Sequence, residues 1–133
     1  MMSDIDELMP IASTVSQAKG WDAFTRALML AGKDLDLLDV SLRTAQNAVE
    51  GCESPVWVSY CSSEQQLKAY SPSKIIRGVL AVLLEKANSL TPTQRAGFDF
   101  DTYLKRCQLE RYLSQSRGNG IKAVINTLRH FAE

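Results

Sequence analysis

Apolar residues recur at helical spacing along much of the chain. In 21–35 ("WDAFTRALMLAGKDL") the positions Trp21, Phe24, Leu28 and Ala31 share one helical face, and Gly32 offers a place for the helix to end. In 72–88 ("PSKIIRGVLAVLLEKAN"), which begins with Pro72, apolar residues cover a surface too broad for a single stripe. The pattern therefore predicts a helix in each segment, with the second one buried.

Further helices are predicted nearer the two ends. The first begins at Ser3 or Asp4 and is broken or kinked at Pro10. Thr91 is a cap for a helix that starts at Pro92, and the helical pattern continues through 98–115 with Tyr103, Leu104 and Cys107 on one face. The last helix follows a Gly-rich turn at 116–120 and is amphipathic, with apolar residues at Ile121, Val124, Ile125, Leu128 and Phe131.

The spacing changes in the middle of the chain. The segments 47–52 ("NAVEGC") and 54–62 ("SPVWVSYCS") are typical of extended backbone around a turn, and 65–71 can return as a partner strand. The connections are too short for a crossover, so the strands should pair antiparallel. We expect an α+β fold in which helices pack on a small antiparallel sheet of about three strands.

Composition limits the class of protein. A chain of 133 residues with 45% apolar and 23% charged residues suits one globular domain over 1–133. No stretch approaches the length of a membrane span, and the acidic start "MMSDIDELMP" is unlike a signal peptide. Three cysteines without a CxxC pair suit free thiols in a reducing compartment, so a cytoplasmic protein is expected.

The charge is divided unevenly between the two halves. Residues 1–64 contain ten acidic and four basic residues, whereas 65–133 contain five acidic and eleven basic ones. No run of five basic residues occurs, so nucleic acid is not an expected partner. The asymmetry fits either a partner surface or mutual attraction of the two halves.

The candidate chemistry centres on Cys52. Taken alone, a free cysteine is more often a small buried apolar residue than a nucleophile. Here Gly51 precedes it and Pro55 follows, and both favour a turn that exposes the thiol. A catalytic pair with the single histidine, His130, and a metal or cluster site built from Cys52, Cys61, Cys107 and His130 stay open, although the cysteine spacings match no standard ligand pattern. Otherwise Cys61 and Cys107 are expected to fill core space.

The "SRGNG" stretch at 116–120 is only superficially similar to a phosphate-binding loop, because no strand leads into it and no GxxxxGK[ST] motif is present. A turn at the start of the last helix is the simpler interpretation, with Arg117 available to a carboxylate or an anion.

Three blocks in order resemble the SufE/CsdE family of sulfur-acceptor proteins, over about Trp21 to the C-terminus. "QNAVEGCESPVW" is similar to the family's N-x-I-x-G-C-x-S-x-V-W block, "IIRGVLAVLL" to its I-V-x-G-L-x-A-x-L segment, and "LSQSRGNGI" to its L-x-P-S-R-x-x-G-L turn. The stretch "TPTQRAGFDFDTYL" favours SufE over CsdE. The resemblance implies an α+β fold related to that of the IscU-like cluster scaffold proteins.

The resemblance also implies a function and partners. Cys52 would accept sulfur from the persulfide of a SufS- or CsdA-type cysteine desulfurase, stimulate that enzyme, and pass the sulfur to a SufBCD-type scaffold for iron–sulfur cluster assembly. No cofactor and no metal of its own are implied. The protein would be an accessory of the desulfurase rather than an enzyme that turns over alone.

Five further residues match the family motifs and are expected to support or dock the loop: Gly51, Ser54, Trp57, Arg117 and Gly120. For Trp57, a core position is at least as good an interpretation. The alternatives are an iron–sulfur scaffold, a CsdE-type carrier that feeds tRNA modification or another sulfur pathway, and an independent thiol enzyme. A homodimer also stays open.

Overall fold

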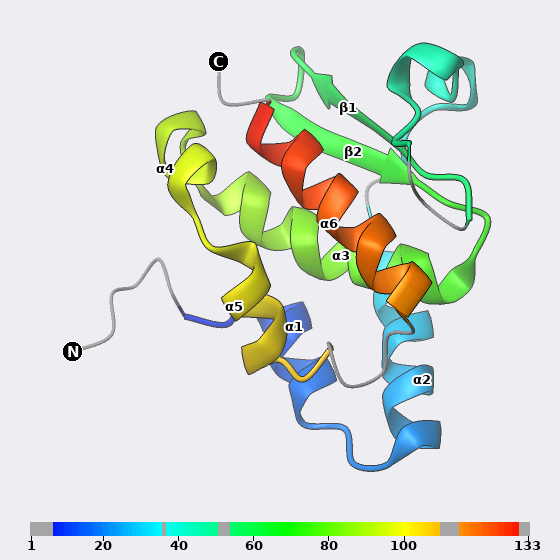
Figure 1. Cartoon of the computed structure of the whole chain (residues 1–133), viewed down its shortest axis with the longest axis vertical. Coiled ribbons are helices and arrows are strands. Elements are labelled where there is room, and N and C mark those ends of the chain that lie inside the picture. The colour runs from blue at the N-terminus through cyan, green and yellow to red at the C-terminus, as the bar shows by residue number, and fades with distance from the viewer. Residues whose placement is uncertain (1–6, 36, 51–53, 110–114, 131–133) are drawn as a thin grey trace.

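The computed structural model describes residues 7–35, 37–50, 54–109 and 115–130. These residues form helices around a two-stranded antiparallel sheet, so the predicted α+β class is confirmed (Figure 1). The elements are α1 (Pro10–Ser16), α2 (Trp21–Ala31), η2 (Gly32–Asp34), η3 (Val40–Leu42), η4 (Ala45–Asn47), β1 (Trp57–Cys61), β2 (Gln66–Tyr70), α3 (Lys74–Ser89), α4 (Pro92–Gly97), α5 (Phe100–Arg106) and α6 (Gln115–His130), the η elements being 3-10 helices.

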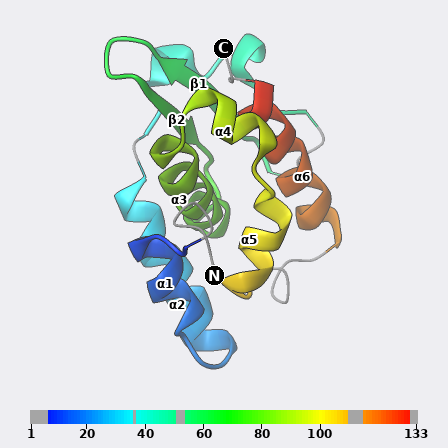
Figure 2. The same cartoon turned by 90° about the vertical axis from the view of Figure 1, so that its left-hand side faces the viewer.

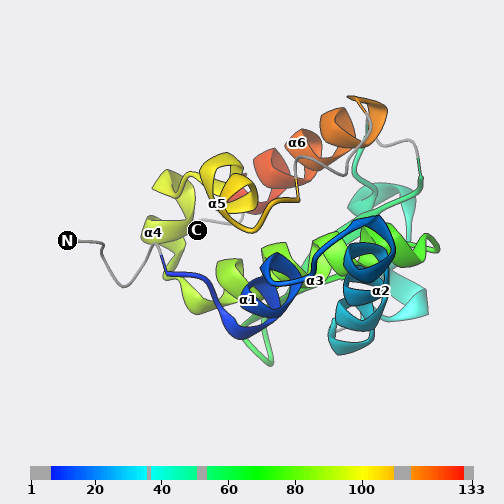
Figure 3. The same cartoon turned by 90° about the horizontal axis from the view of Figure 1, so that it is seen from below.

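Helix α3 is the central element, as its broad apolar surface predicts. Figure 1 shows the sheet on one side of α3 and α1 with α2 on the other, and Figure 3 shows α5 and α6 on a further side. The residues from Gly78 to Leu84 are all buried. The helix begins two residues later than Pro72 suggests, because the hydroxyl of Ser73 accepts a hydrogen bond from the N–H of Ile76 and caps the first turn.

Helix α1 begins at Pro10, whereas the sequence pattern placed a break or kink there. Proline has no N–H to lose at the first position of a helix, so it starts α1 instead of interrupting it. The expected start at Ser3 or Asp4 lies outside the described residues. Helix α2 confirms its prediction and turns Phe24, Leu28 and Ala31 into the core.

The sheet contains two strands where about three were expected. β1 and β2 pair antiparallel with Trp57 opposite Tyr70 and Cys61 opposite Gln66. On the described part of 47–52, the extended backbone forms only an isolated bridge between Ala48 and Trp57. The η4 turn immediately before this bridge uses local hydrogen bonds, so the ladder does not extend further toward the N-terminus.

Helices α4, α5 and α6 form the other side of the molecule (Figure 2). Thr91 caps α4 in a reciprocal capping box with Gln94, and Pro92 is its first residue, as predicted. The long helix expected over 98–115 is much shorter, because α5 ends at Arg106 and Gln108 takes a positive φ of 65° that no α-helix continues.

The start of α6 differs from its prediction. The "SRGNG" stretch lies within the helix rather than in a turn before it, since α6 begins at Gln115. Its apolar residues Ile121, Val124, Ile125 and Leu128 are buried as predicted, and this packing holds a Gly-rich segment helical despite a cost of about 1 kcal/mol per glycine. Phe131 lies outside the described residues.

None of the helices in the described part of the chain combines the length and the apolar character needed to cross a membrane.

Candidate functional site

The segment around Cys52 is held at its two ends by paired backbone. The N–H of Val49 donates a 2.8 Å hydrogen bond to the carbonyl of Val56, and both side chains are buried. We call this pair, with the Ala48–Trp57 bridge beside it, the stem. Gly51 and Cys52 themselves lie outside the described residues, whereas Ser54 is half-buried between them and the stem.

An aromatic pair lies at the stem. Trp57 begins β1, and its ring stacks on Tyr70 of β2 with 6.3 Å between centroids and 27° between ring planes. The two residues are direct partners in the antiparallel register, so the pair braces the end of the sheet from which the chain runs back to Val56 and Val49. Both rings are half-buried.

Two arginines surround Tyr70 from other elements. The guanidinium carbon of Arg43 lies 3.5 Å from the centroid of the Tyr70 ring, and its Nε–H donates to the carbonyl of Leu38 at 2.9 Å. The guanidinium of Arg77, on α3, lies 5.7 Å from the same ring. Cation–π contacts of this kind contribute about 0.5–1 kcal/mol at partly exposed sites. Arg43, Tyr70 and Arg77 thus form a cationic and aromatic group of side chains beside the stem, which we call the surround of the stem.

Sequence reasoning named Trp57 but missed Tyr70, Arg43 and Arg77. The signal for Tyr70 was the strand register: once Trp57 is placed opposite position 70, an aromatic pair follows. The two arginines carry no local signal, because they come from a loop before the stem and from the first turn of α3.

The structure places Arg117 and Gly120 in the first turns of α6. Gly120 is buried, and α6 packs against both β1 and α4. The residues predicted to form a turn are therefore the first turns of α6, and α6 contacts β1, the strand that follows the stem. His130 is the last residue of the same helix.

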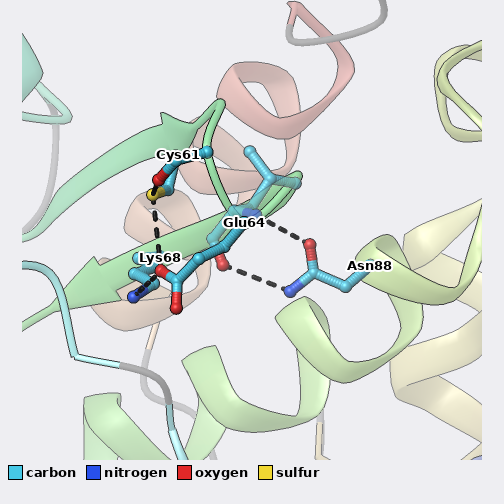
Figure 4. A network of polar contacts seen from close by, with 6 residues as sticks. Cys61, Glu64, Lys68 and Asn88 are labelled. Carbon is cyan, nitrogen blue, oxygen red and sulfur yellow. Dashed lines mark hydrogen bonds and ion pairs between the residues drawn. The ribbon is translucent and has the colours of Figure 1, made fainter.

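The two described cysteines differ in surroundings. Cys107 is fully buried at the end of α5, and burial raises the pKa of its thiol to about 11. Cys61 was expected to fill core space, but it is half-exposed at the β1–β2 hairpin, where its sulfur lies 3.4 Å from a carboxylate oxygen of Glu64 and 3.3 Å from the hydroxyl of Ser63 (Figure 4). The expectation holds for Cys107 and is wrong for Cys61.

Glu64 links Cys61 to the neighbouring strand. It forms an ion pair with Lys68 on β2, and hydrogen bonds from Lys68 and from Cys61 lower the pKa of the Glu64 carboxyl. The hairpin turn itself needs Gln65 at a positive φ of 54°. This solvent-exposed network links the two strands of the hairpin, because Glu64 contacts both Cys61 on β1 and Lys68 on β2.

Within the described ranges, no three histidine, cysteine or acidic side chains gather in a way that could hold a metal ion.

Comparison with known protein families matches residues 9–132 to the model described as SufE, an Fe-S metabolism associated domain. The matched range includes the stem, the sheet and helices α1 to α6.

Proposed function

Because the chain belongs to the SufE family and takes part in iron–sulfur metabolism, we propose that it accepts sulfur on Cys52 from a partner protein and passes it on for cluster assembly. Family membership implies a sulfur donor such as a cysteine desulfurase as a partner. The finer proposal is that the donor's persulfide reacts with Cys52 and that this acceptance stimulates the donor's turnover.

The observation that carries the proposal is the stem. Val49 and Val56 are buried and hydrogen-bonded to each other, and Cys52 lies between them in the sequence. Because the backbone is paired on both sides of Cys52 in the sequence, the two ends of this short connection are fixed. This supports a Cys52 thiol presented at the end of the sheet. The aromatic pair of Trp57 and Tyr70 stiffens the same end.

The proposed step needs no cofactor. The Cys52 thiolate attacks the terminal sulfur of the donor's persulfide, R–S–SH. The donor's S–S bond breaks, a new S–S bond forms on Cys52, and the donor cysteine leaves as a thiolate, so no oxidant or reductant is consumed. The chain then carries Cys52–S–SH to the next acceptor, for which we propose an iron–sulfur scaffold of the SufBCD type.

Supporting roles follow for the other motif residues. Gly51 would allow the turn before the thiol, Ser54 would fix its return to the stem, and Trp57 would anchor that return on β1. Arg117 and Gly120, at the start of α6, would border the docking surface. We place the protein in the cytoplasm as a single domain over 1–133, where Cys52 stays reduced between encounters.

The remaining thiols fit this reaction less well. At pH 8 a thiol with a pKa of about 11 is ionised in only about one molecule in a thousand, so Cys107 is a poor nucleophile as well as a buried one. Cys61 is accessible, but its sulfur is hydrogen-bonded to Glu64 within the β1–β2 hairpin and lies outside the motif that surrounds Cys52. Cys52 is thus the thiol we assign to sulfur transfer.

Intact-protein mass spectrometry tests the proposal. The chain is incubated briefly with a SufS-type desulfurase and free cysteine, without reductant, beside the variants Cys52→Ser and Cys61→Ser. We expect the wild type and Cys61→Ser to gain the mass of sulfur, Cys52→Ser to gain none, and desulfurase turnover to rise only with chains that keep Cys52. Sulfur that loads equally on Cys52→Ser would overturn the assignment.

A further inference from the structure

A groove of about 570 Å³ lies along α2 and the start of α3, apart from the stem. Its apolar lining includes Trp21, Met29 and Leu30, whose exposed fractions are 58%, 38% and 55%. Exposed apolar residues are ordinary when scattered singly, but these three line one concave surface.

The groove runs along the side of α2 that adjoins its core face. At 100° per residue Trp21 lies about 20° from the buried Leu28, and Met29 and Leu30 follow about 80° and 180° further round the helix. The polar residues Asp22, Thr25 and Arg26 lie between them. This side of α2 is therefore mixed, with three exposed apolar side chains among polar ones.

Basic side chains border the groove. Arg26 and Lys33 come from α2 and η2, and Lys74 and Arg77 come from the first turn of α3, against a single acidic lining residue, Asp22. Within the described ranges, none of the four basic groups forms an ion pair, and the buried Nε of Arg77 has no hydrogen-bond acceptor. Four basic side chains and one carboxylate give the groove a net positive lining.

Arg77 lines the groove and also lies near Tyr70, which is beside the stem. A Cβ placed on Gly32, at the groove, would lie 3.1 Å from the Cβ of Arg77, so η2 and α3 meet closely there. The guanidinium of Arg77 then lies 5.7 Å from the ring of Tyr70, which stacks on Trp57. A partner seated in the groove would therefore lie near the residues that hold the stem.

We propose that this groove binds an acidic segment of the sulfur donor, with an apolar side chain of that segment against Trp21, Met29 and Leu30 and its carboxylates beside Arg26, Lys33 and Lys74. The chemistry is that of an amphipathic peptide, because an apolar floor with a basic border complements apolar anchors flanked by carboxylates. The proposal rests on the proposed function, since it names the surface by which the donor is held while Cys52 reacts.

The test separates binding from transfer. Affinity for a SufS-type desulfurase is measured by isothermal titration with the Cys52→Ser chain, which cannot accept sulfur. Three variants are made in this background: Lys33→Glu, the double variant Arg26→Glu with Lys33→Glu, and Trp21→Ser. The matched controls are Lys105→Glu, which changes an exposed lysine on α5, and Tyr60→Ser, which changes an exposed aromatic residue on β1. Circular dichroism and thermal midpoints confirm that each variant is folded.

We expect the double charge reversal to weaken binding by about tenfold or more, with Trp21→Ser weakening it as well and both controls within about twofold of the parent. A synthetic peptide that carries glutamates around one leucine should compete for the groove, and its glutamine version should not. Higher salt should weaken binding of the parent more than binding of the double variant.

Other results would overturn the inference. Unchanged desulfurase affinity in the charge-reversed chain, or no binding by the parent at all, would remove this groove as the donor's site. If the same variants instead dissolve a dimer of this chain in analytical ultracentrifugation while donor binding is unchanged, the occupant is a second copy. Failure of the proposed function appears separately, as a wild-type chain that binds the donor through the groove but gains no sulfur on Cys52.

Discussion

The side-chain amide of Asn88 on α3 forms the two backbone hydrogen bonds with Leu67 on β2 that a neighbouring strand would otherwise form. Its Oδ1 accepts a 2.8 Å hydrogen bond from the Leu67 N–H, and its Nδ2 donates a 3.2 Å hydrogen bond to the Leu67 carbonyl (Figure 4). Two residues further along, the carbonyl of Ala69 accepts from the N–H of Leu38 on the same edge. Edge strands expose unpaired backbone groups, and here a side chain and a loop cover them.

Asn88→Asp should destabilise the fold at neutral pH by about 1–3 kcal/mol, because a carboxylate can accept from the Leu67 N–H but turns its second oxygen toward the Leu67 carbonyl. Urea denaturation gives the free energy of unfolding. At pH 4 the gap from wild type should narrow, since a protonated aspartic acid can again donate. A variant as stable as wild type at pH 7 would show that the amide bridge contributes nothing.

Helices α2 and α3 approach each other closely at Gly78. A Cβ placed there would overlap the carbonyl oxygen of Leu28 and lie 2.7 Å from its carbonyl carbon, and both groups are backbone that cannot rotate away. Gly78→Ala should therefore cost at least about 2 kcal/mol of unfolding free energy. Gly97→Ala is the matched control, since nothing lies within 4 Å of a Cβ there, and it should be neutral or stabilising by up to about 1 kcal/mol. Equal effects of the two substitutions would contradict this account of the packing.

Glu85 predicts a specific pH dependence. Its carboxylate accepts a 2.9 Å hydrogen bond from the Ile11 N–H at the start of α1, while burial raises the pKa of the Glu85 carboxyl above its ordinary 4.5 and the hydrogen bonds from Ile11 and Ala12 partly oppose that rise. The folded state therefore binds this proton more tightly than the unfolded state does. The resulting stability is present below pH 4.5 and is lost as the pH rises through the raised pKa.

Glu85→Gln removes this titration, so its stability relative to wild type should improve steadily as the pH is raised from about 4 to 7. Glu64→Gln is the control of opposite sign, because the pKa of Glu64 is lowered by its hydrogen bonds with Lys68 and Cys61 and its ionised form is favoured in the folded chain. Thermal midpoints measured across the pH range report both trends. Parallel curves for wild type and Glu85→Gln would show that burial does not raise the pKa of this carboxyl in the folded chain.

The sequence predicted those parts of the fold that depend on local patterns. The core face of α2, the buried α3 and the capped start of α4 follow from apolar spacing and from Thr91 and Pro92. The end of α5 could not be predicted, because the residue with a positive φ there is Gln108, whereas a positive φ is expected from glycine. At the start of α6 the glycines suggested a turn, and tertiary packing of the buried apolar residues overrode that local preference.

The candidate site could likewise be predicted only where it depends on local sequence. Cys52 could be singled out because glycine and proline around a cysteine form a local motif, and the family resemblance rests on contiguous blocks. The two arginines beside the stem could not be found from the sequence, and Tyr70 could be found only once the strand register was known. Arg43, Tyr70 and Arg77 come together only through strand register and the placement of α3, which are relationships between distant segments.

Tyr70 offers a test of whether that surround positions the reactive segment. Tyr70→Leu keeps apolar bulk but removes the ring on which Trp57 stacks and over which the Arg43 guanidinium lies at 3.5 Å. Loss of one aromatic pair and one cation–π contact should lower the unfolding free energy by about 1–2 kcal/mol. If the stem positions Cys52, the rate of sulfur loading from the desulfurase should also fall, by roughly tenfold.

The matched control for this substitution is Tyr60→Leu, which changes an exposed tyrosine on β1 away from the stem. Sulfur loading is followed by quenched mass spectrometry, and iodoacetamide labelling of Cys52 is measured in parallel. Slower loading with unchanged labelling indicates misplacement of an intact thiol, because a small reagent does not require the segment to be oriented. Loading by Tyr70→Leu at the wild-type rate would show that the aromatic pair stabilises the sheet without orienting Cys52.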